Sequence, residues 1–264
     1  MNRKKSIETI NGYDGYWDVL VIGGGATGLG CALDGASRGY KTLLVEQHDF
    51  AKGTSSRSTK LVHGGVRYLQ QGNISLVLEA LQERGLLMQN APHLVQNQAF
   101  IVPNYEWWDG PFYGVGLKVY DLLAGRLGLG PSKWLSKAET RKRIPTLAPD
   151  QVRCGVLYYD GHFDEALLAV NEDQSIEDAG GVPVYYMQVT GLTYSGKMID
   201  GVRLKDTIDG EEREVRARVV VNATGIFTDD ILRMDQPAAA PIITHSQGVH
   251  LVLDKRFLKG NTAI

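Results

Sequence analysis

Cysteine is scarce in this sequence, and the cysteines present are far apart. Cys31 and Cys154 are the two among 264 residues, and no Cys-x-x-Cys pair occurs. Disulfide frameworks and thiolate metal sites need more cysteines at closer spacing. The composition therefore argues against a metal centre or a disulfide-stabilised secreted domain, and it favours a reducing compartment.

Long apolar runs and an excess of charge of one sign are missing as well. No apolar run reaches the roughly 18 residues that a transmembrane helix needs. The basic start, Met1–Lys5, is not followed by the apolar core of a signal peptide. With a formal net charge of −2, nucleic acid is not expected as the main partner. What remains is the composition of an ordinary globular chain, without repeats or low-complexity segments.

Glycine is abundant, and a cluster near the N-terminus carries a motif. Residues 23–28 read Gly-Gly-Gly-Ala-Thr-Gly, which fits G-x-G-x-x-G. An apolar run at 18–22 predicts a strand before it, and helix 26–38 and strand 41–45 are predicted after it. In that context the glycines permit a tight turn and close approach of a pyrophosphate, which the helix N-terminus attracts. The dinucleotide site is predicted to include Gly23, Gly25, Ala26, Thr27 and Gly28.

Glu46 stands at the end of the second predicted strand, 18 residues after Gly28. A carboxylate there can accept hydrogen bonds from both ribose hydroxyls of a dinucleotide. It would also repel a 2′-phosphate, so NADP is disfavoured.

A strand-rich region later in the chain favours FAD over NAD. Strands are predicted at 184–189, 191–194, 201–205 and 214–221, and the last leads into Asn222-Ala223-Thr224-Gly225. A meander that returns to a second turn beside the dinucleotide is typical of flavoproteins, whereas simple NAD dehydrogenases continue with alternating strands and helices. Val189, Ala223 and Gly225 are therefore assigned to the cofactor.

Other segments carry weaker patterns. Helices are expected at 74–88, at 117–123 and at 136–143, the last with a Ser136–Glu139 capping box. A strand is expected at 248–253, and residues 1–16 are interpreted as a polar arm.

The segment Thr54–Leu69, TSSRSTKLVHGGVRYL, closely resembles FAD-dependent glycerol-3-phosphate dehydrogenases, which are D-amino-acid-oxidase-like flavoproteins. The resemblance runs from about residue 17 over nearly the whole chain. It continues through Ala91-Pro92-His93-Leu94, Tyr159-Asp160-Gly161, Asn222-Ala223-Thr224-Gly225 and Gln247-Gly248-Val249-His250. Two departures are His245, where the family usually has proline, and Leu167, where arginine is common.

The resemblance implies an α/β fold in which a Rossmann-type FAD-binding domain is interleaved with a mixed-sheet substrate domain. The FAD-binding domain is expected at 17–100 and 150–235, and substrate-domain segments at 101–149 and 236–264. Family members continue well beyond the last residue here, so a C-terminally truncated chain is expected. Residues 1–264 alone are expected to bind FAD weakly and not to turn over substrate.

The resemblance also implies an activity: oxidation of sn-glycerol 3-phosphate to dihydroxyacetone phosphate, with electrons passed to a membrane quinone. It implies a cytoplasmic enzyme attached peripherally to the inner membrane face. A glycerol-3-phosphate oxidase that uses O₂ and a non-catalytic FAD-binding fragment are the alternatives. The oligomeric state stays open, a homodimer included.

Site residues follow from the same resemblance. Arg67, Tyr68 and His250 match family positions at the substrate pocket, and His63-Gly64-Gly65 matches the segment beside the flavin. Histidine suits the proton-accepting role near neutral pH, and an arginine fork suits a phosphate. Which histidine is the base stays open. Hydroxyl and N–H groups for the pyrophosphate and flavin are assigned to Thr54, Ser55, Ser58 and Gly64.

Overall fold

A computed structural model describes the chain except Met1, Pro149 and Lys259, and it divides into two compact units. The first unit comprises Met1–Ser58 and Glu165–Gly248; the second comprises Thr59–Asp164 and Val249–Ile264. Each unit has its own sheet and its own hydrophobic core.

These boundaries differ from those predicted, since residues 59–100 and 150–164 fall in the second unit. The reason is a long strand pair, β4 (Val95–Asn104) with β6 (Cys154–Phe163), which runs antiparallel over the full length of both strands. The predicted boundary at residue 100 would divide β4 itself and separate Ile101–Asn104 from β6, the strand that satisfies their backbone hydrogen bonds.

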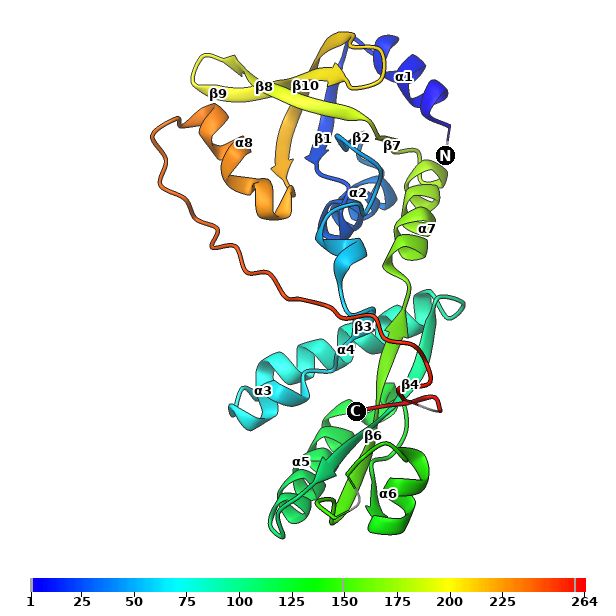
Figure 1. The fold of residues 1–264 in the computed structure, drawn as a ribbon. Coiled ribbons are helices and arrows are strands. Elements are labelled where there is room, and N and C mark those ends of the chain that lie inside the picture. Colours follow the sequence, from blue (N-terminus) through cyan, green and yellow to red (C-terminus); the bar gives the residue numbers. More distant parts are fainter. Residues whose placement is uncertain (1, 149, 259) are drawn as a thin grey trace. The chain divides into compact units, whose positions relative to one another are not determined.

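The first unit is built on a six-stranded sheet in the order β7-β2-β1-β10-β9-β8 (Figure 1). Strands β7, β2, β1 and β10 run parallel, and β10, β9 and β8 form an antiparallel meander. The strand bounds are β1 (Tyr16–Ile22), β2 (Thr42–Val45), β7 (Val182–Val184), β8 (Met187–Ser195), β9 (Met198–Asp206) and β10 (Glu212–Asn222).

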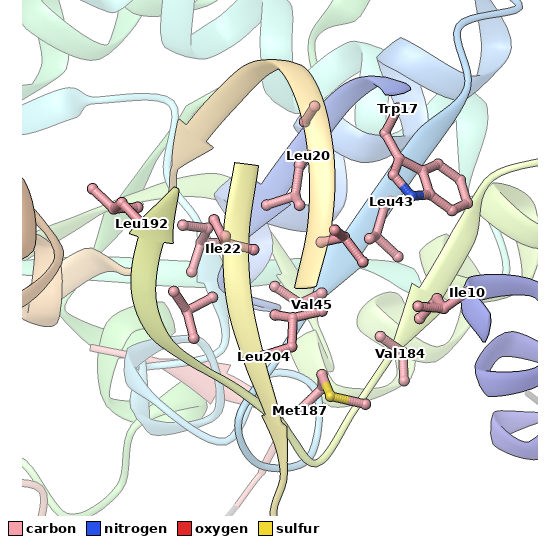
Figure 2. Close-up of a cluster of buried hydrophobic side chains, with 14 residues drawn as sticks. Ile10, Trp17, Leu20, Ile22, Leu43, Val45, Val184, Met187, Leu192 and Leu204 are labelled. Carbon is pink, nitrogen blue, oxygen red and sulfur yellow. The ribbon is translucent and has the colours of Figure 1, made fainter. Parts of the chain in front are cut away.

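Strand β2 and the last three residues of β1 are buried on both faces, as their apolar runs predict, whereas β10 is partly exposed. Val21 joins a cluster with side chains of α2 (Ala26–Ser37) and α7 (Glu165–Asp178), which pack side by side on the sheet. Leu20 and Ile22, one residue away on either side, point to the opposite face. There they join a second cluster with residues of the meander, among them Leu192 and Leu204 (Figure 2).

The N-terminal segment interpreted as a polar arm is instead a docked helix, α1 (Arg3–Asn11). The Asn2 side chain caps it by accepting a hydrogen bond from the Lys5 N–H at 3.1 Å. Ile10 is buried in the core, and Arg3 Nη2 lies 2.6 Å from the buried Asp206 carboxylate. Packing of Ile7 and Ile10 against the core and a partly buried ion pair therefore order a segment that is polar on average.

The second unit contains a five-stranded sheet with the path β11-β4-β6-β3 and with β5 beside β6. The three short strands are β3 (Leu61–Val62), β5 (Lys133–Ser136) and β11 (Thr262–Ala263). Four helices accompany them: α3 (Val66–Gln70), α4 (Ile74–Asn90), α5 (Asp109–Ala124) and α6 (Lys137–Arg143). Helix α5 extends well beyond the predicted 117–123, and the predicted Ser136–Glu139 capping box of α6 is confirmed.

The strand expected at 248–253 is not formed. These residues carry no regular structure, and Val249, Leu251 and Leu253 are exposed. An alternating pattern suffices for a strand only when a neighbouring strand accepts and donates its backbone hydrogen bonds. No such neighbour pairs with this segment in the part of the chain that the structure describes.

The remaining elements are short. They are the 3-10 turns η1 (Thr54–Arg57), η2 (Gly125–Leu127) and η3 (Gly225–Phe227), and the helix α8 (Thr228–Asp235). Among the described residues, no helix is both long and apolar enough to cross a bilayer.

Candidate functional site

The glycine loop after β1 is shaped by close backbone contacts. A Cβ atom on Gly28 would lie 1.8 Å from the Gly23 carbonyl oxygen, and one on Gly23 would lie 2.6 Å from the Ala223 carbonyl oxygen. Gly23 also has φ +108°, which side-chain-bearing residues rarely adopt. Both glycines are therefore required, and the second turn, at Ala223, lies against the first because β1 and β10 are parallel neighbours.

Helix α2 begins without a side-chain cap of its own. Gly25 is the N-cap and supplies no side-chain hydrogen bond, and the first turn carries no acidic residue. The Ala26 N–H donates to Ser55 Oγ at 3.0 Å, while Ala26 and Thr27 are exposed. A helix N-terminus behind a narrow glycine loop attracts a phosphate, so this cradle fits the diphosphate of a dinucleotide.

Glu46 braces the same loop. Its Oε2 accepts a hydrogen bond from the Gly24 N–H at 2.7 Å, and its Oε1 accepts one from the His48 N–H at 2.7 Å. A carboxylate oxygen has two lone pairs, so each oxygen retains capacity for a ribose hydroxyl. The residue thus shapes the loop and keeps the acceptor sites that the sequence predicts.

The other predicted cofactor residues differ in availability. Ser55 holds the Ala26 amide, Thr54 is exposed in η1, and Ser58 Oγ donates a hydrogen bond to the Glu165 carboxylate. Gly225 opens η3 with φ +58°. Val189 is buried in the core, so a cofactor contact there would have to come from its backbone.

A second group of polar residues is assembled around Asp160, in strand β6 of the second unit. Asp160 Oδ1 receives Arg84 Nη1 at 2.6 Å, the Gly64 N–H at 2.9 Å and the Tyr120 hydroxyl at 3.3 Å. Asp160 Oδ2 lies 3.2 Å from His63 Nδ1. Sequence segments far apart thereby meet at one carboxylate.

This cluster is buried at one end and open at the other. The side chains of Arg84 and Asp160 are 1% and 2% exposed, whereas that of His63 is 58% exposed. Burial in the absence of an opposite charge would be very unfavourable for Asp160, and Arg84 supplies that charge. Burial, with the Asp160 charge beside it, raises the pKa of Tyr120 well above its ordinary value, so its hydroxyl keeps its proton.

The His-Gly-Gly sequence is explained by the packing of this cluster. A Cβ atom on Gly64 would lie 1.8 Å from the Tyr120 hydroxyl and 2.6 Å from a Leu81 methyl group. Gly65 has φ +81° and caps the N-terminus of α3. Gly64 therefore has no room for a side chain, and Gly65 has a backbone conformation that residues with a side chain rarely adopt.

The remaining predicted site residues are not joined to this cluster by any hydrogen bond found among the described residues. Tyr68 is exposed in α3, and His250 is exposed in the irregular segment after β10 and α8. The Arg67 side chain lies outside what the structure describes. His245 Nε2 lies 2.9 Å from the Ile226 carbonyl oxygen, so the histidine that replaces the usual proline attaches its loop to η3.

Sequence reasoning did not assign roles to Arg84, Tyr120 or Asp160. A usable signal was present for Arg84, which interrupts the apolar face of α4 next to Leu81 and Gly85. A charge on a buried helix face requires a partner. Its partner, 76 residues away, cannot be read from spacing.

Comparison with known proteins agrees with this geometry. Residues 18–263 match the family model described as FAD dependent oxidoreductase. The mitochondrial glycerol-3-phosphate dehydrogenase of Homo sapiens is 46% identical over 250 residues, which is 90% of this chain and 34% of that protein. The corresponding enzyme of Arabidopsis thaliana is 43% identical over 249 residues, or 89% of this chain and 40% of that protein.

Solved structures of flavoproteins are also similar to this chain. Glycerol-3-phosphate dehydrogenase from Bacillus halodurans in complex with FAD superposes with a TM-score of 0.68 at 31% identity, covering 89% of this chain and 39% of that chain. The L-alpha-glycerophosphate oxidase of Mycoplasma pneumoniae, at 18% identity and a TM-score of 0.63 over 84% of this chain and 57% of that chain, shows the shared fold alone.

The chain spans about a third of the length of the curated relatives that it matches. Its α/β fold is the one found in these flavoproteins, and the cradle between Gly23 and Gly28 suits the cofactor after which the family is described. We conclude that the chain belongs to the FAD-dependent oxidoreductase family and that FAD is its cofactor.

Proposed function

We propose that the chain takes part in oxidising sn-glycerol 3-phosphate to dihydroxyacetone phosphate, with a quinone as electron acceptor. The observation that carries this proposal is the 46% identity, over 90% of the chain, to proteins named glycerol-3-phosphate dehydrogenase. The fold alone would not support it, because proteins of this fold act on different substrates.

The first unit would hold the cofactor. The helix α2 N-terminus and the glycine loop would hold the diphosphate, Glu46 the adenosine ribose, and the turn at Ala223 would pack beside the loop. FAD, when bound, supplies the acceptor for the two electrons and the hydrogen that leave the substrate carbon as hydride. Val189 and Gly225 are proposed as further backbone contacts.

The second unit would handle the proton and the phosphate. When the C2 alcohol becomes a ketone, the hydrogen on C2 leaves as hydride and the hydroxyl group loses a proton. We assign that proton to Nε2 of His63, since Nδ1 faces Asp160 and the side chain is 58% exposed. We propose, as the resemblance implies, that Arg67, Tyr68 and His250 contact the substrate, with Arg67 on the phosphate.

A surface of the second unit supports peripheral membrane attachment, which the quinone acceptor requires. Helix α5 exposes Phe112, Val115, Val119 and Leu122 at spacings of three and four residues, so they share one face. Trp107 and Trp108 are exposed just before the helix. Aromatic residues next to an apolar helix face favour a membrane interface, here proposed to be the cytoplasmic side of the inner membrane.

The test uses FAD-loaded protein of the length of its relatives, because residues 1–264 alone are expected to bind FAD weakly and not to turn over substrate. sn-Glycerol 3-phosphate is added anaerobically, and the visible flavin absorption band is followed. We expect the band to bleach with glycerol 3-phosphate and to persist with glycerol. A band that persists with both would contradict the proposed substrate. Mixing the reduced protein with a soluble quinone or with O₂ then identifies the acceptor, and faster reoxidation by O₂ would favour the oxidase instead.

A further inference from the structure

We propose that Asp160 is a positioning residue that holds the His63 imidazole with its hydrogen on Nδ1 and its Nε2 free to accept a proton. This inference rests on the proposed function for its chemical purpose. Its structural content, the tautomer and orientation of one ring, can be tested without any turnover.

The two carboxylate oxygens of Asp160 contact different groups. Oδ1 is surrounded by three donors, Arg84 Nη1 at 2.6 Å, the Gly64 N–H at 2.9 Å and the Tyr120 hydroxyl at 3.3 Å. Oδ2 faces His63 Nδ1 at 3.2 Å. The first oxygen therefore attaches the carboxylate to its surroundings, and the second is directed at the histidine.

The tautomer follows from the inventory of donors and acceptors. A carboxylate can only accept hydrogen bonds, so the ring nitrogen facing Oδ2 must be the one that carries hydrogen. In a neutral imidazole the other nitrogen, Nε2, then has a free lone pair. The side chain of His63 is 58% exposed, so this lone pair can be reached by a substrate hydroxyl.

The same carboxylate also fixes the backbone beside the ring. The Gly64 N–H donates to Asp160, and Gly64 packs under Tyr120 and Leu81 without room for a side chain. Main chain and ring are thus anchored at one point. Once His63 has taken up a proton, the nearby negative charge of Asp160 stabilises the imidazolium, as the acid does in Ser-His-Asp triads.

Asp160→Asn makes the decisive variant. Three donors surround Oδ1, so the amide oxygen of asparagine should take that place and the NH₂ group should take the place of Oδ2. An NH₂ group facing Nδ1 requires that nitrogen to accept, which moves the ring hydrogen to Nε2. The lone pair needed for proton uptake would then be lost.

The measurement is ¹⁵N NMR of the histidine side chains of the FAD-loaded protein, with His63 identified by His63→Gln. We expect the Nδ1–H form in the unmodified protein and the Nε2–H form in Asp160→Asn. Turnover of glycerol 3-phosphate should fall by about a hundredfold or more, the range for losing a general base, with KM and FAD affinity nearly unchanged.

Tyr120→Phe is the matched control. It removes one donor from Oδ1 and leaves Oδ2 and His63 untouched, so the tautomer should stay Nδ1–H. Asp160→Asn leaves the charge of buried Arg84 uncompensated and can unfold the second unit. The double variant Asp160→Asn/Arg84→Gln removes both charges and keeps the test feasible, because the Gly64 N–H still directs the amide oxygen.

An Nε2–H tautomer in the unmodified protein would overturn the inference, as would an unchanged tautomer in both folded Asp160 variants. The proposed function fails differently, through an unmodified protein that binds FAD but is not reduced by glycerol 3-phosphate. NMR and flavin bleaching therefore separate the two.

Discussion

Gly28 lies so close to Gly23 that a Cβ atom at position 28 would be 1.8 Å from the Gly23 carbonyl oxygen. This contact brings the start of α2 up to the end of β1 and keeps the loop between them narrow. The narrowness is what allows the helix amides to face a phosphate.

Gly28→Ala is therefore expected to abolish measurable FAD binding, because the loop must open to admit the methyl group. Gly30→Ala is the matched control in the same helix, since a Cβ there meets nothing within 4 Å. It should bind FAD normally and melt slightly higher, as alanine favours a helix over glycine by about 1 kcal/mol. Titration followed by flavin fluorescence measures both; equal affinities would refute the role of the contact.

Glu46→Ala is expected to weaken FAD binding by about 1–3 kcal/mol, the usual effect of removing a charged hydrogen-bond partner. Glu46 also accepts from the Gly24 and His48 N–H groups, so part of the loss would come from a looser loop. Glu46→Gln keeps one acceptor oxygen, so its FAD affinity should lie between those of the unmodified protein and Glu46→Ala. Calorimetric titration gives the affinities, and an affinity unchanged in Glu46→Ala would remove Glu46 from the site.

Arg67→Lys is expected to raise KM for glycerol 3-phosphate clearly more than KM for glycerol, because lysine lacks the fork that binds a phosphate through two N–H groups. Steady-state kinetics with both substrates makes the comparison. Equal changes would show that Arg67 does not contact the phosphate.

The stability of the first unit should depend on pH through α7. Burial raises the pKa of Glu172 from 4.5 to about 7, and burial also raises that of Asp173, from 3.8 to about 6, with Glu177 adding to it. Buried carboxylate oxygens of both residues lack a hydrogen-bond partner among the described residues.

Proton linkage determines the direction in which stability changes with pH. Since the folded protein holds these protons more tightly, their stabilising contribution is complete below the unfolded pKa of 4.5 for Glu172 and is lost as pH rises toward 7. Glu172→Gln should flatten this decline and raise Tm above pH 7 by a few degrees, since about 1 kcal/mol shifts Tm by about 2–4 °C in a chain of this size. Exposed Glu214→Gln is the control, and parallel Tm curves for all three proteins would contradict the assignment.

Local pattern was sufficient for the βαβ unit. For the meander it indicated strands, but β8 (Met187–Ser195) is one strand where two were expected, at 184–189 and 191–194. The strand expected at 18–22 is β1 at Tyr16–Ile22, and the expected helix at 26–38 is α2 at Ala26–Ser37. Apolar runs, a glycine turn and helical spacing act over a few residues, so they are visible in sequence. The FAD fold followed from the same signals and from the family resemblance.

Segments whose structure depends on a distant partner were not predicted. Helix α1 is ordered by Asp206, some two hundred residues away along the chain, and the pattern at 248–253 lacks a strand to pair with. The average polarity of residues 1–16 indicated an unstructured arm, and the alternation at 248–253 indicated a strand. Both predictions were wrong because docking on the core and pairing with a neighbouring strand supply the free energy that decides these structures.

The candidate site divides in the same way. The sequence by itself predicted the glycine loop and Glu46 from residue types at short spacing, and the family resemblance implied the role of the His63-Gly64-Gly65 segment. Only the tertiary structure decided that Arg84, Tyr120 and Asp160 meet beside His63. The physical reason is that a buried charge must find its counter-charge in three dimensions, and antiparallel pairing of β6 with its neighbours, together with the packing of α4 and α5, brings these residues together.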